Sequence, residues 1–211
     1  MSQFVQPSDL ELAALISSKI CHDVINPVGA IYNGLEILSE EDDADAKSYA
    51  LDVIRNVTEQ ASARLQFARF AFGASGGVGA LIDLSTAEQI SRGFVGQGKH
   101  KLLWQTPSGY LSKDRVKLLL NLVAAGISAL PRGGEIAVTL KAPLEQSPFE
   151  VRCKGTGARP PQHLIDFLGQ GPKPELNSMT IQFYYTTRLA ECAGMRLDVA
   201  KDGLDVVLRA R

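Results

Sequence analysis

The sequence has few cysteines, no long apolar run and no excess of one charge. Its three cysteines, Cys21, Cys153 and Cys192, lie far apart without metal-ligand spacing, so we expect reduced thiols and a cytoplasmic location. It has no run of about 20 apolar residues and no basic stretch followed by an apolar one at its start, so we expect neither a membrane span nor a secretory leader. The net charge of −1 gives no reason to expect a nucleic-acid or anionic-membrane surface.

The first third of the chain predicts two long helices. Ser8-Asp9-Leu10-Glu11 is a capping-box pattern and begins a helix that we expect to run to about residue 39. The acidic stretch 40–43 breaks it, and a second helix is predicted over 44–72. Gly73 ends this helix, and residues 74–79 have the composition of a flexible linker. We therefore expect two domains, a helical hairpin over 1–75 and a second domain over 80–211.

One face of the first predicted helix carries apolar or small residues in steps of four and three, which is typical of a helix in a bundle. The members of this predicted seam are Leu10, Ala14, Ser17, Cys21, Val24, Val28, Ile31, Leu35 and Leu38. Leu12, Ile16 and Ile20 lie outside it. Because two helices do not enclose a core, we expect two hairpins to form a four-helix bundle in a homodimer. The alternative is that the hairpin docks onto its own second domain.

The second half predicts a two-layer α/β sandwich, so the whole chain is of the α+β class. Helices alternate there with short strands, and Gly203 follows Lys201-Asp202 in a clear hairpin turn. Ser85-Thr86-Ala87-Glu88 is a second capping box. The expected helices are 85–96, 113–130, 161–168 and 178–192, and the expected strands are 101–106, 135–141, 149–154, 196–200 and 205–209.

His22 lies beside the seam in the middle of the first predicted helix. An adjacent polar strip on the same helix is formed by Lys19, His22, Asn26, Gly29 and Asn33. Pro27 has no N–H to donate to the carbonyl of Asp23, so we expect the helix to bend there. A polar surface histidine on a kinked helix is the plain alternative to a functional one.

Two sequence features resemble two-component histidine kinases. The stretch from His22 to Pro27, His-Asp-Val-Ile-Asn-Pro, resembles their phospho-accepting H-box. The order of elements in the second half resembles their ATP-binding domain, a fold shared with gyrase and MutL ATPases. The resemblance fails at three nucleotide-binding positions. Ala125 stands where the family has its metal-holding asparagine, Cys153 stands where it has the adenine-binding aspartate, and bulky residues 180–185 replace its glycine-rich box.

These departures predict a domain that does not use ATP. An H-box hairpin joined to such a domain is similar, over essentially the whole chain, to histidine phosphotransferases of alphaproteobacterial cell-cycle phosphorelays. That resemblance implies a homodimer that takes a phosphoryl group from the receiver domain of a CckA-like hybrid kinase. It implies CtrA-like and CpdR-like response regulators as acceptors. Mg²⁺ is expected on the receiver domain, and no cofactor is expected on this chain.

The residue types indicate a mechanism for such a transfer. An imidazole is largely neutral near pH 7, so one ring nitrogen of His22 has a free lone pair, and the resemblance implies that this is Nε2. Asp23 is expected to fix the ring tautomer and Lys19 to offset phosphoryl charge. Asn26 is expected either to position water or to bind the receiver.

Receiver docking is expected to use residues near His22 on the exposed side. The candidates are Ile25, Gly29, Tyr32 and Asn33. For Ile25 and Tyr32 a place in the bundle core is an equal alternative.

Two other functions stay open at the level of sequence. One is a histidine kinase with an unusual ATP site, which a nucleotide titration would reveal. The other is a non-catalytic module that sequesters a response regulator, which would take no label from a phosphorylated receiver.

Overall fold

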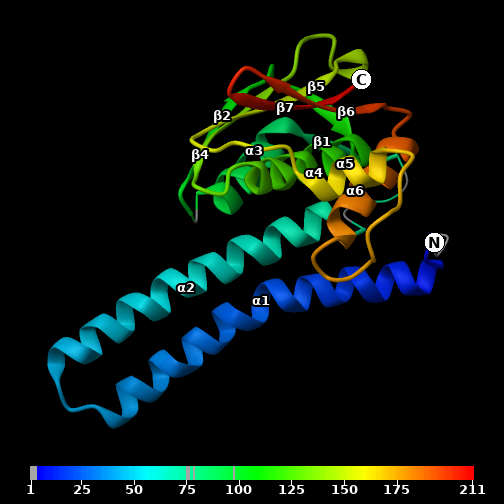
Figure 1. Ribbon diagram of the computed structural model, residues 1–211. Coiled ribbons are helices and arrows are strands. Elements are labelled where there is room, and N and C mark those ends of the chain that lie inside the picture. The colour runs from blue at the N-terminus through cyan, green and yellow to red at the C-terminus, as the bar shows by residue number, and fades with distance from the viewer. Residues whose placement is uncertain (1–3, 75–76, 78, 97) are drawn as a thin grey trace.

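The computed structural model describes residues 4–74, 77, 79–96 and 98–211. A long helical hairpin extends from a domain that combines helices with a β-sheet (Figure 1). The hairpin consists of α1 (Asp9–Glu40) and α2 (Ala44–Ala71). These bounds confirm both predicted helices to within one residue. The predicted linker over 74–79 lies partly outside the described residues. No helix in the described ranges is both long enough and apolar enough to cross a membrane.

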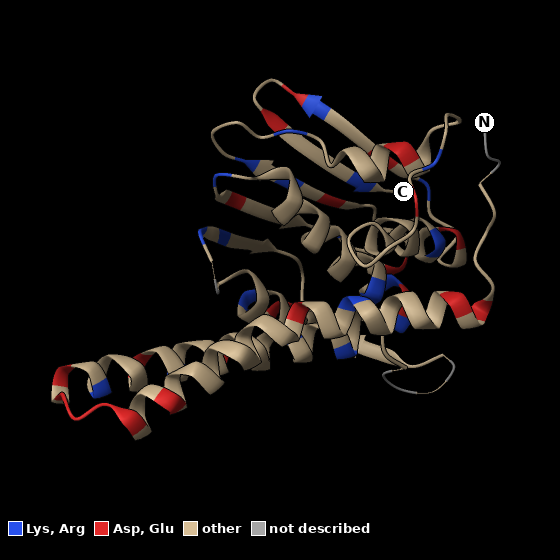
Figure 2. Cartoon of the chain, turned by 60° about the horizontal axis from the view of Figure 1, so that its bottom comes forward, with Lys and Arg blue, Asp and Glu red and all other residues tan. Residues whose placement is uncertain are grey.

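The two helices of the hairpin begin at polar caps. Ser8 accepts from the Glu11 N–H while the Glu11 carboxylate accepts from the Ser8 N–H, which confirms the predicted capping box. The Asp43 side chain accepts from the Asp45 N–H at the start of α2. Acidic side chains crowd the tip between the helices, so the far end of the hairpin is negatively charged (Figure 2).

The second domain contains a five-stranded sheet with helices on one face (Figure 1). The strand order is β2-β4-β5-β7-β6, where β2 and β4 run parallel and the other neighbours run antiparallel. The strands are β2 (His100–Gln105), β4 (Gly134–Thr139), β5 (Phe149–Lys154), β6 (Leu197–Asp202) and β7 (Asp205–Ala210). The helices are α3 (Leu84–Val95), α4 (Lys113–Ala129), α5 (Gln162–Leu168) and α6 (Ile181–Cys192). The predicted sandwich is therefore confirmed.

Three small elements differ from the sequence prediction. β1 (Leu81–Asp83) and β3 (Tyr110–Ser112) form a separate two-stranded sheet, and a short 3₁₀ turn spans Leu144–Gln146. These segments of three residues are too short to show a period. The predicted cap at Ser85 is wrong, because the Asp83 side chain accepts from the Ser85 N–H and α3 begins at Leu84.

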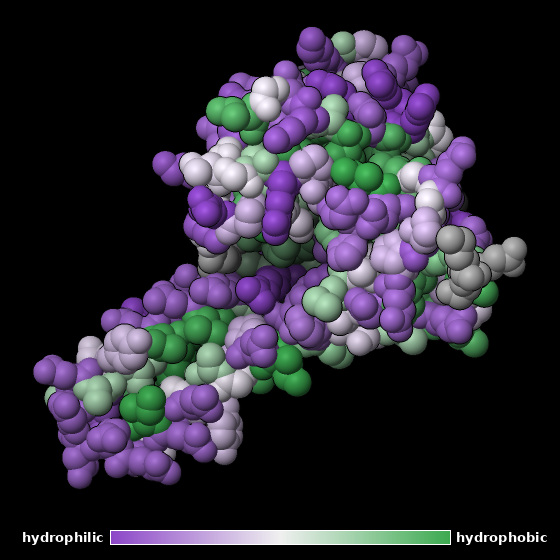
Figure 3. Space-filling model, viewed as in Figure 1, coloured by the Kyte–Doolittle hydropathy of each residue, from purple (hydrophilic) through white to green (hydrophobic). Residues whose placement is uncertain are grey.

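The hairpin rests on the second domain by one end only. Phe67 and Ala71 near the end of α2 belong to the core of the second domain, and the Phe67 ring stacks on Phe94 of α3 with centroids 3.8 Å apart. Leu12 and Ile16 in the first half of α1 also pack against this core. The other end of the hairpin projects away from the domain (Figures 1 and 3). The hairpin therefore does dock onto the chain's own second domain, but only at one end.

The predicted seam of α1 is not its main contact with α2. Most of its members face solvent in the single chain: Leu10, Ala14, Ser17, Cys21, Val28 and Leu35. The face of α1 that meets α2 lies about 100° further round. Pro27 and Gly34 are buried there, and a Cβ on Gly34 would come within 2.6 Å of Ile54 Cγ1 on α2. The two fully buried residues of α1 are thus a proline and a glycine, which a search for large apolar side chains does not find.

The close packing of Gly134 at the start of β4 against the end of β5 can be tested by substitution. Its φ of 145° suits glycine, and a Cβ would collide with the Lys154 carbonyl oxygen on the neighbouring strand β5. We expect Gly134→Ala to lower the free energy of unfolding by about 4 kcal/mol in urea denaturation. Gly203→Ala is the matched control, because Gly203 also has positive φ but a Cβ there would meet no described atom within 4 Å. The control should lose only about 1–2 kcal/mol, and equal losses would contradict this packing.

Candidate functional site

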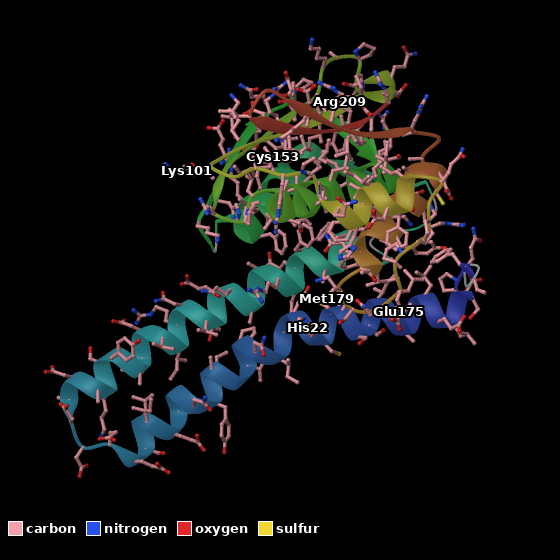
Figure 4. The ribbon with its side chains drawn as sticks, in the orientation of Figure 1. His22, Lys101, Cys153, Glu175, Met179 and Arg209 are labelled. Carbon is pink, nitrogen blue, oxygen red and sulfur yellow. The ribbon has the colours of Figure 1, made fainter. Side chains whose placement is uncertain are left out.

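His22 stands on the exposed side of α1, near the middle of the hairpin helix (Figure 4). Its side chain is 58% exposed, and its neighbours on the predicted polar strip, Asn26, Gly29 and Asn33, are exposed as well. No described atom lies within 4 Å of the position that a Cβ on Gly29 would occupy. The imidazole is thus open to a visiting surface, and the strip beside it leaves room for that surface to approach.

Asp23 contacts the ring of His22. Its Oδ1 lies 3.4 Å from Nδ1 of His22, and its other oxygen, Oδ2, forms an ion pair with Nζ of Lys19 one turn earlier. An ionised carboxylate only accepts hydrogen bonds, so this contact favours the form of the ring with its proton on Nδ1. The Nδ1–H tautomer leaves the lone pair on Nε2, which is the atom expected to react.

Arg64 of α2 holds the backbone of the same residue. Its Nη1 donates to the Asp23 carbonyl oxygen at 2.9 Å. The carbonyl is available because Pro27, four residues later, has no N–H to offer it. Lys19, Asp23 and Arg64 also line one cleft of about 350 Å³ with Phe94 and Gln182, where the hairpin meets the second domain.

The two apolar docking candidates lie on the surface of the single chain. Ile25 is 66% exposed and Tyr32 62% exposed, next to Val28 and Leu35, which are also exposed. These four residues recur in steps of three and four along α1, so they form one continuous apolar stripe beside the polar strip. Within this chain the four side chains lie outside the contact between α1 and α2, so the stripe is accessible to a partner.

Two of the positions where the sequence departs from the kinases, Ala125 and Cys153, are buried, and so is Asn121, four residues before Ala125. Asn121 is fully buried, and its amide donates to the carbonyls of Ala71 and Lys117 at 3.1 and 2.9 Å. Ala125 is buried on the same helix, α4. Cys153 is buried on β5, where a Cβ added to Gly126 would come within 3.1 Å of its Sγ.

The chemistry of these positions suits packing better than nucleotide binding. Burial, with a smaller contribution from the charge of Asp205, raises the pKa of the Cys153 thiol to about 12, so it has no charge with which to fix an adenine amino group. In place of a glycine-rich loop, Ile181, Phe183 and Tyr184 fill the first turn of α6 and are buried. The Tyr184 ring lies against Phe167, with centroids 5.6 Å apart. Among the residues that the structure describes, no group of three or more His, Cys, Asp or Glu side chains could hold a metal ion.

Comparisons with known proteins agree with this architecture. Residues 84–205 match the family model of the histidine phosphotransferase C-terminal domain. The chain is 43% identical to the protein phosphotransferase ChpT of Brucella abortus (strain 2308), and the match covers 100% of both chains. A solved structure of a bacterial phosphotransferase is 39% identical, with 100% of both chains covered and a TM-score of 0.91. A histidine kinase of Acinetobacter baumannii, AdeS, matches at 10% identity and a TM-score of 0.48, over 90% of this chain and 95% of the other.

A helical hairpin joined to an α/β domain of this family defines a phosphotransferase. The chain belongs to the histidine phosphotransferase family, of the ChpT type.

The structure brings together three of the residues chosen from sequence, Lys19, His22 and Asp23, and places Asn26 one turn further on the same face. Sequence reasoning missed Arg64. The available signal was the missing N–H of Pro27, which leaves the Asp23 carbonyl in need of a donor. That signal does not reveal which residue of a second helix supplies the donor.

Thiol reactivity tests whether the Cys153 position is closed. Cys21 and Cys192 are exposed, whereas Cys153 is buried and its pKa is raised to about 12. We therefore expect two of the three thiols to react quickly with a disulfide reagent at pH 8, and the third only after unfolding. Cys153→Ala should keep both fast thiols. Three fast thiols in the native protein would contradict the closed site.

Proposed function

We propose that this protein shuttles a phosphoryl group between aspartates of receiver domains through His22. The observation that carries the proposal is an exposed imidazole whose Nδ1 faces a carboxylate, which leaves Nε2 free as a nucleophile. The phosphotransferase family to which the chain belongs supports the reaction class. Receivers of the CckA-like hybrid kinase type are the proposed donors, and CtrA-like and CpdR-like regulators the proposed acceptors, all in the cytoplasm.

The proposed reaction begins with an in-line attack of Nε2 of His22 on the phosphorus of a receiver's phospho-aspartate. An N–P bond forms as the P–O bond to the aspartate breaks, and the aspartate leaves as a carboxylate. Mg²⁺ bound to the receiver offsets the charge on the phosphoryl oxygens. The reverse steps deliver the group to the aspartate of a second receiver.

Asp23 has a specific part in this exchange. When a neutral ring with its proton on Nδ1 gains a phosphoryl group on Nε2, the ring becomes positively charged. The Asp23 carboxylate beside Nδ1 stabilises that charge without forming a bond to phosphorus. Lys19 is occupied by the ion pair with Asp23, so we assign it to holding this carboxylate in addition to offsetting phosphoryl charge. Asn26 is assigned to hydrogen bonding with the docked receiver or with water.

We further propose that the protein does not draw its phosphoryl group from ATP. Buried Asn121, Ala125 and Cys153 support this, because a bound nucleotide would require each of these positions to open. The proposed division of labour assigns residues 1–75 to dimerisation and transfer, and 80–211 to a degenerate nucleotide-binding domain that supports the hairpin.

The apolar stripe supports a homodimer in which two hairpins form a four-helix bundle. Ile25, Val28, Tyr32 and Leu35 are too many exposed apolar side chains for a solvated helix face. His22 lies about 120° from Val28 around the helix, so a bundle closed over Val28 and Leu35 still leaves the imidazole outside. Ile25 and Tyr32, at the edge of the stripe, together with Gly29 and Asn33, would then meet the receiver.

Transfer of label from a phosphorylated receiver tests the proposal. We expect the wild-type protein to acquire the label and pass it to a second receiver, and His22→Ala to abolish both steps. His163→Ala is the matched control, because His163 is similarly exposed but lies on α5 of the second domain. Incubation with labelled ATP alone should leave the protein unlabelled. Label that survives on His22→Ala, or that arrives from ATP, would refute the proposal.

The bundle can be tested separately by charging the stripe. We expect the wild type to sediment as a dimer and Val28→Asp/Leu35→Asp to sediment as a folded monomer, since burying two carboxylates in a bundle core is strongly unfavourable. Leu204→Asp is the control, because Leu204 is also apolar and exposed but lies in the β6–β7 turn. A monomeric wild type, or a dimeric double variant, would contradict the proposed bundle closed over Val28 and Leu35.

A further inference from the structure

Pro27 creates a gap in the hydrogen bonding of α1 at the residue next to His22. In an unbroken helix the N–H of residue 27 would donate to the carbonyl of residue 23, and proline has no N–H. Pro27 is buried in the contact with α2, so water does not readily replace that donor. The carbonyl of Asp23 therefore depends on a donor from outside the helix.

Arg64 supplies that donor from α2. Its Nη1 lies 2.9 Å from the Asp23 carbonyl oxygen, and its guanidinium is partly buried. A charged donor makes a stronger bond to a carbonyl than a backbone amide, and the planar guanidinium fixes its direction. The same arginine lines one cleft together with Lys19 and Asp23.

Asp23 is thereby held from several sides. Lys19 binds one carboxylate oxygen and the His22 ring faces the other, and both of these residues belong to α1 itself. Of the contacts seen in the described ranges, the bond from Arg64 is the one that joins Asp23 to α2. It fixes the backbone of Asp23 relative to the second helix, and therefore the Cα from which the carboxylate extends.

We infer that Arg64 is a positioning residue for the transfer reaction. Its guanidinium replaces the hydrogen bond that Pro27 removes, holds Asp23 in place, and through Asp23 keeps His22 in the tautomer with a free Nε2. This inference rests on the proposed function of His22, but the bond and the tautomer can be measured without any transfer. A merely structural arginine would affect stability and leave the tautomer unchanged.

A double-mutant cycle with Pro27 separates the two roles. Arg64→Met removes the donor and keeps an unbranched side chain, and we expect it to slow transfer from a phosphorylated receiver about tenfold. In Pro27→Ala the N–H of residue 27 returns and can donate to the Asp23 carbonyl. Adding Arg64→Met to that background should slow transfer by less than about twofold. The control Arg55→Met, on the exposed part of α2, should leave the rate unchanged.

The ring nitrogens of His22 give a second readout that needs no phosphate. We expect ¹⁵N chemical shifts to show the Nδ1–H tautomer in the wild type, a mixture in Arg64→Met, and recovery of Nδ1–H in Pro27→Ala/Arg64→Met. Arg64→Lys keeps a cationic donor, so its ¹⁵N shifts should stay close to those of the wild type. This variant provides the comparison if Arg64→Met does not fold. If the wild type takes no label, the proposed function fails while these shifts still test the inference.

Two results would overturn the inference. One is that Arg64→Met slows transfer by the same factor in the wild-type background and in the Pro27→Ala background. The other is a His22 tautomer that does not respond to Arg64→Met.

Discussion

The site depends on Asp23, because this one residue connects the His22 ring to the rest of the hairpin. Its side chain faces His22 and pairs with Lys19, and its backbone carbonyl is bound by Arg64 from the neighbouring helix. The last contact exists because Pro27 left the carbonyl free. A proline that weakens a helix therefore also provides the point at which a second helix can hold the site.

The second domain holds the end of α2, the helix that carries Arg64. The Phe67 ring stacks on Phe94, and the amide of Asn121 donates to the carbonyl of Ala71 near the end of α2. The same amide also donates to the carbonyl of Lys117, one turn earlier on α4. The α/β domain thus contributes side chains that anchor the hairpin, which accords with a proposed role in support rather than catalysis.

The sequence predicted most of the fold because its longer elements have strong local signals. The capping box at Ser8 set the start of α1 correctly, and the turn at Gly203 set the start of β7. The apolar pattern around Val28 predicted a helix in a bundle but not which helix it meets, because such a pattern does not distinguish a contact within the chain from one with a partner. β1 and β3 were too short to carry a period. Arg64 was missed because long-range pairing depends on how two helices pack, which local residue patterns do not encode.

The most direct test of the account is the ring nitrogen that carries the phosphoryl group. Phosphorylated protein examined by ³¹P and ¹⁵N NMR should show a single phosphohistidine at His22, with phosphorus bonded to Nε2 and a proton retained on Nδ1 beside Asp23. Phosphorus on Nδ1 of His22, or on any other residue, would contradict the account.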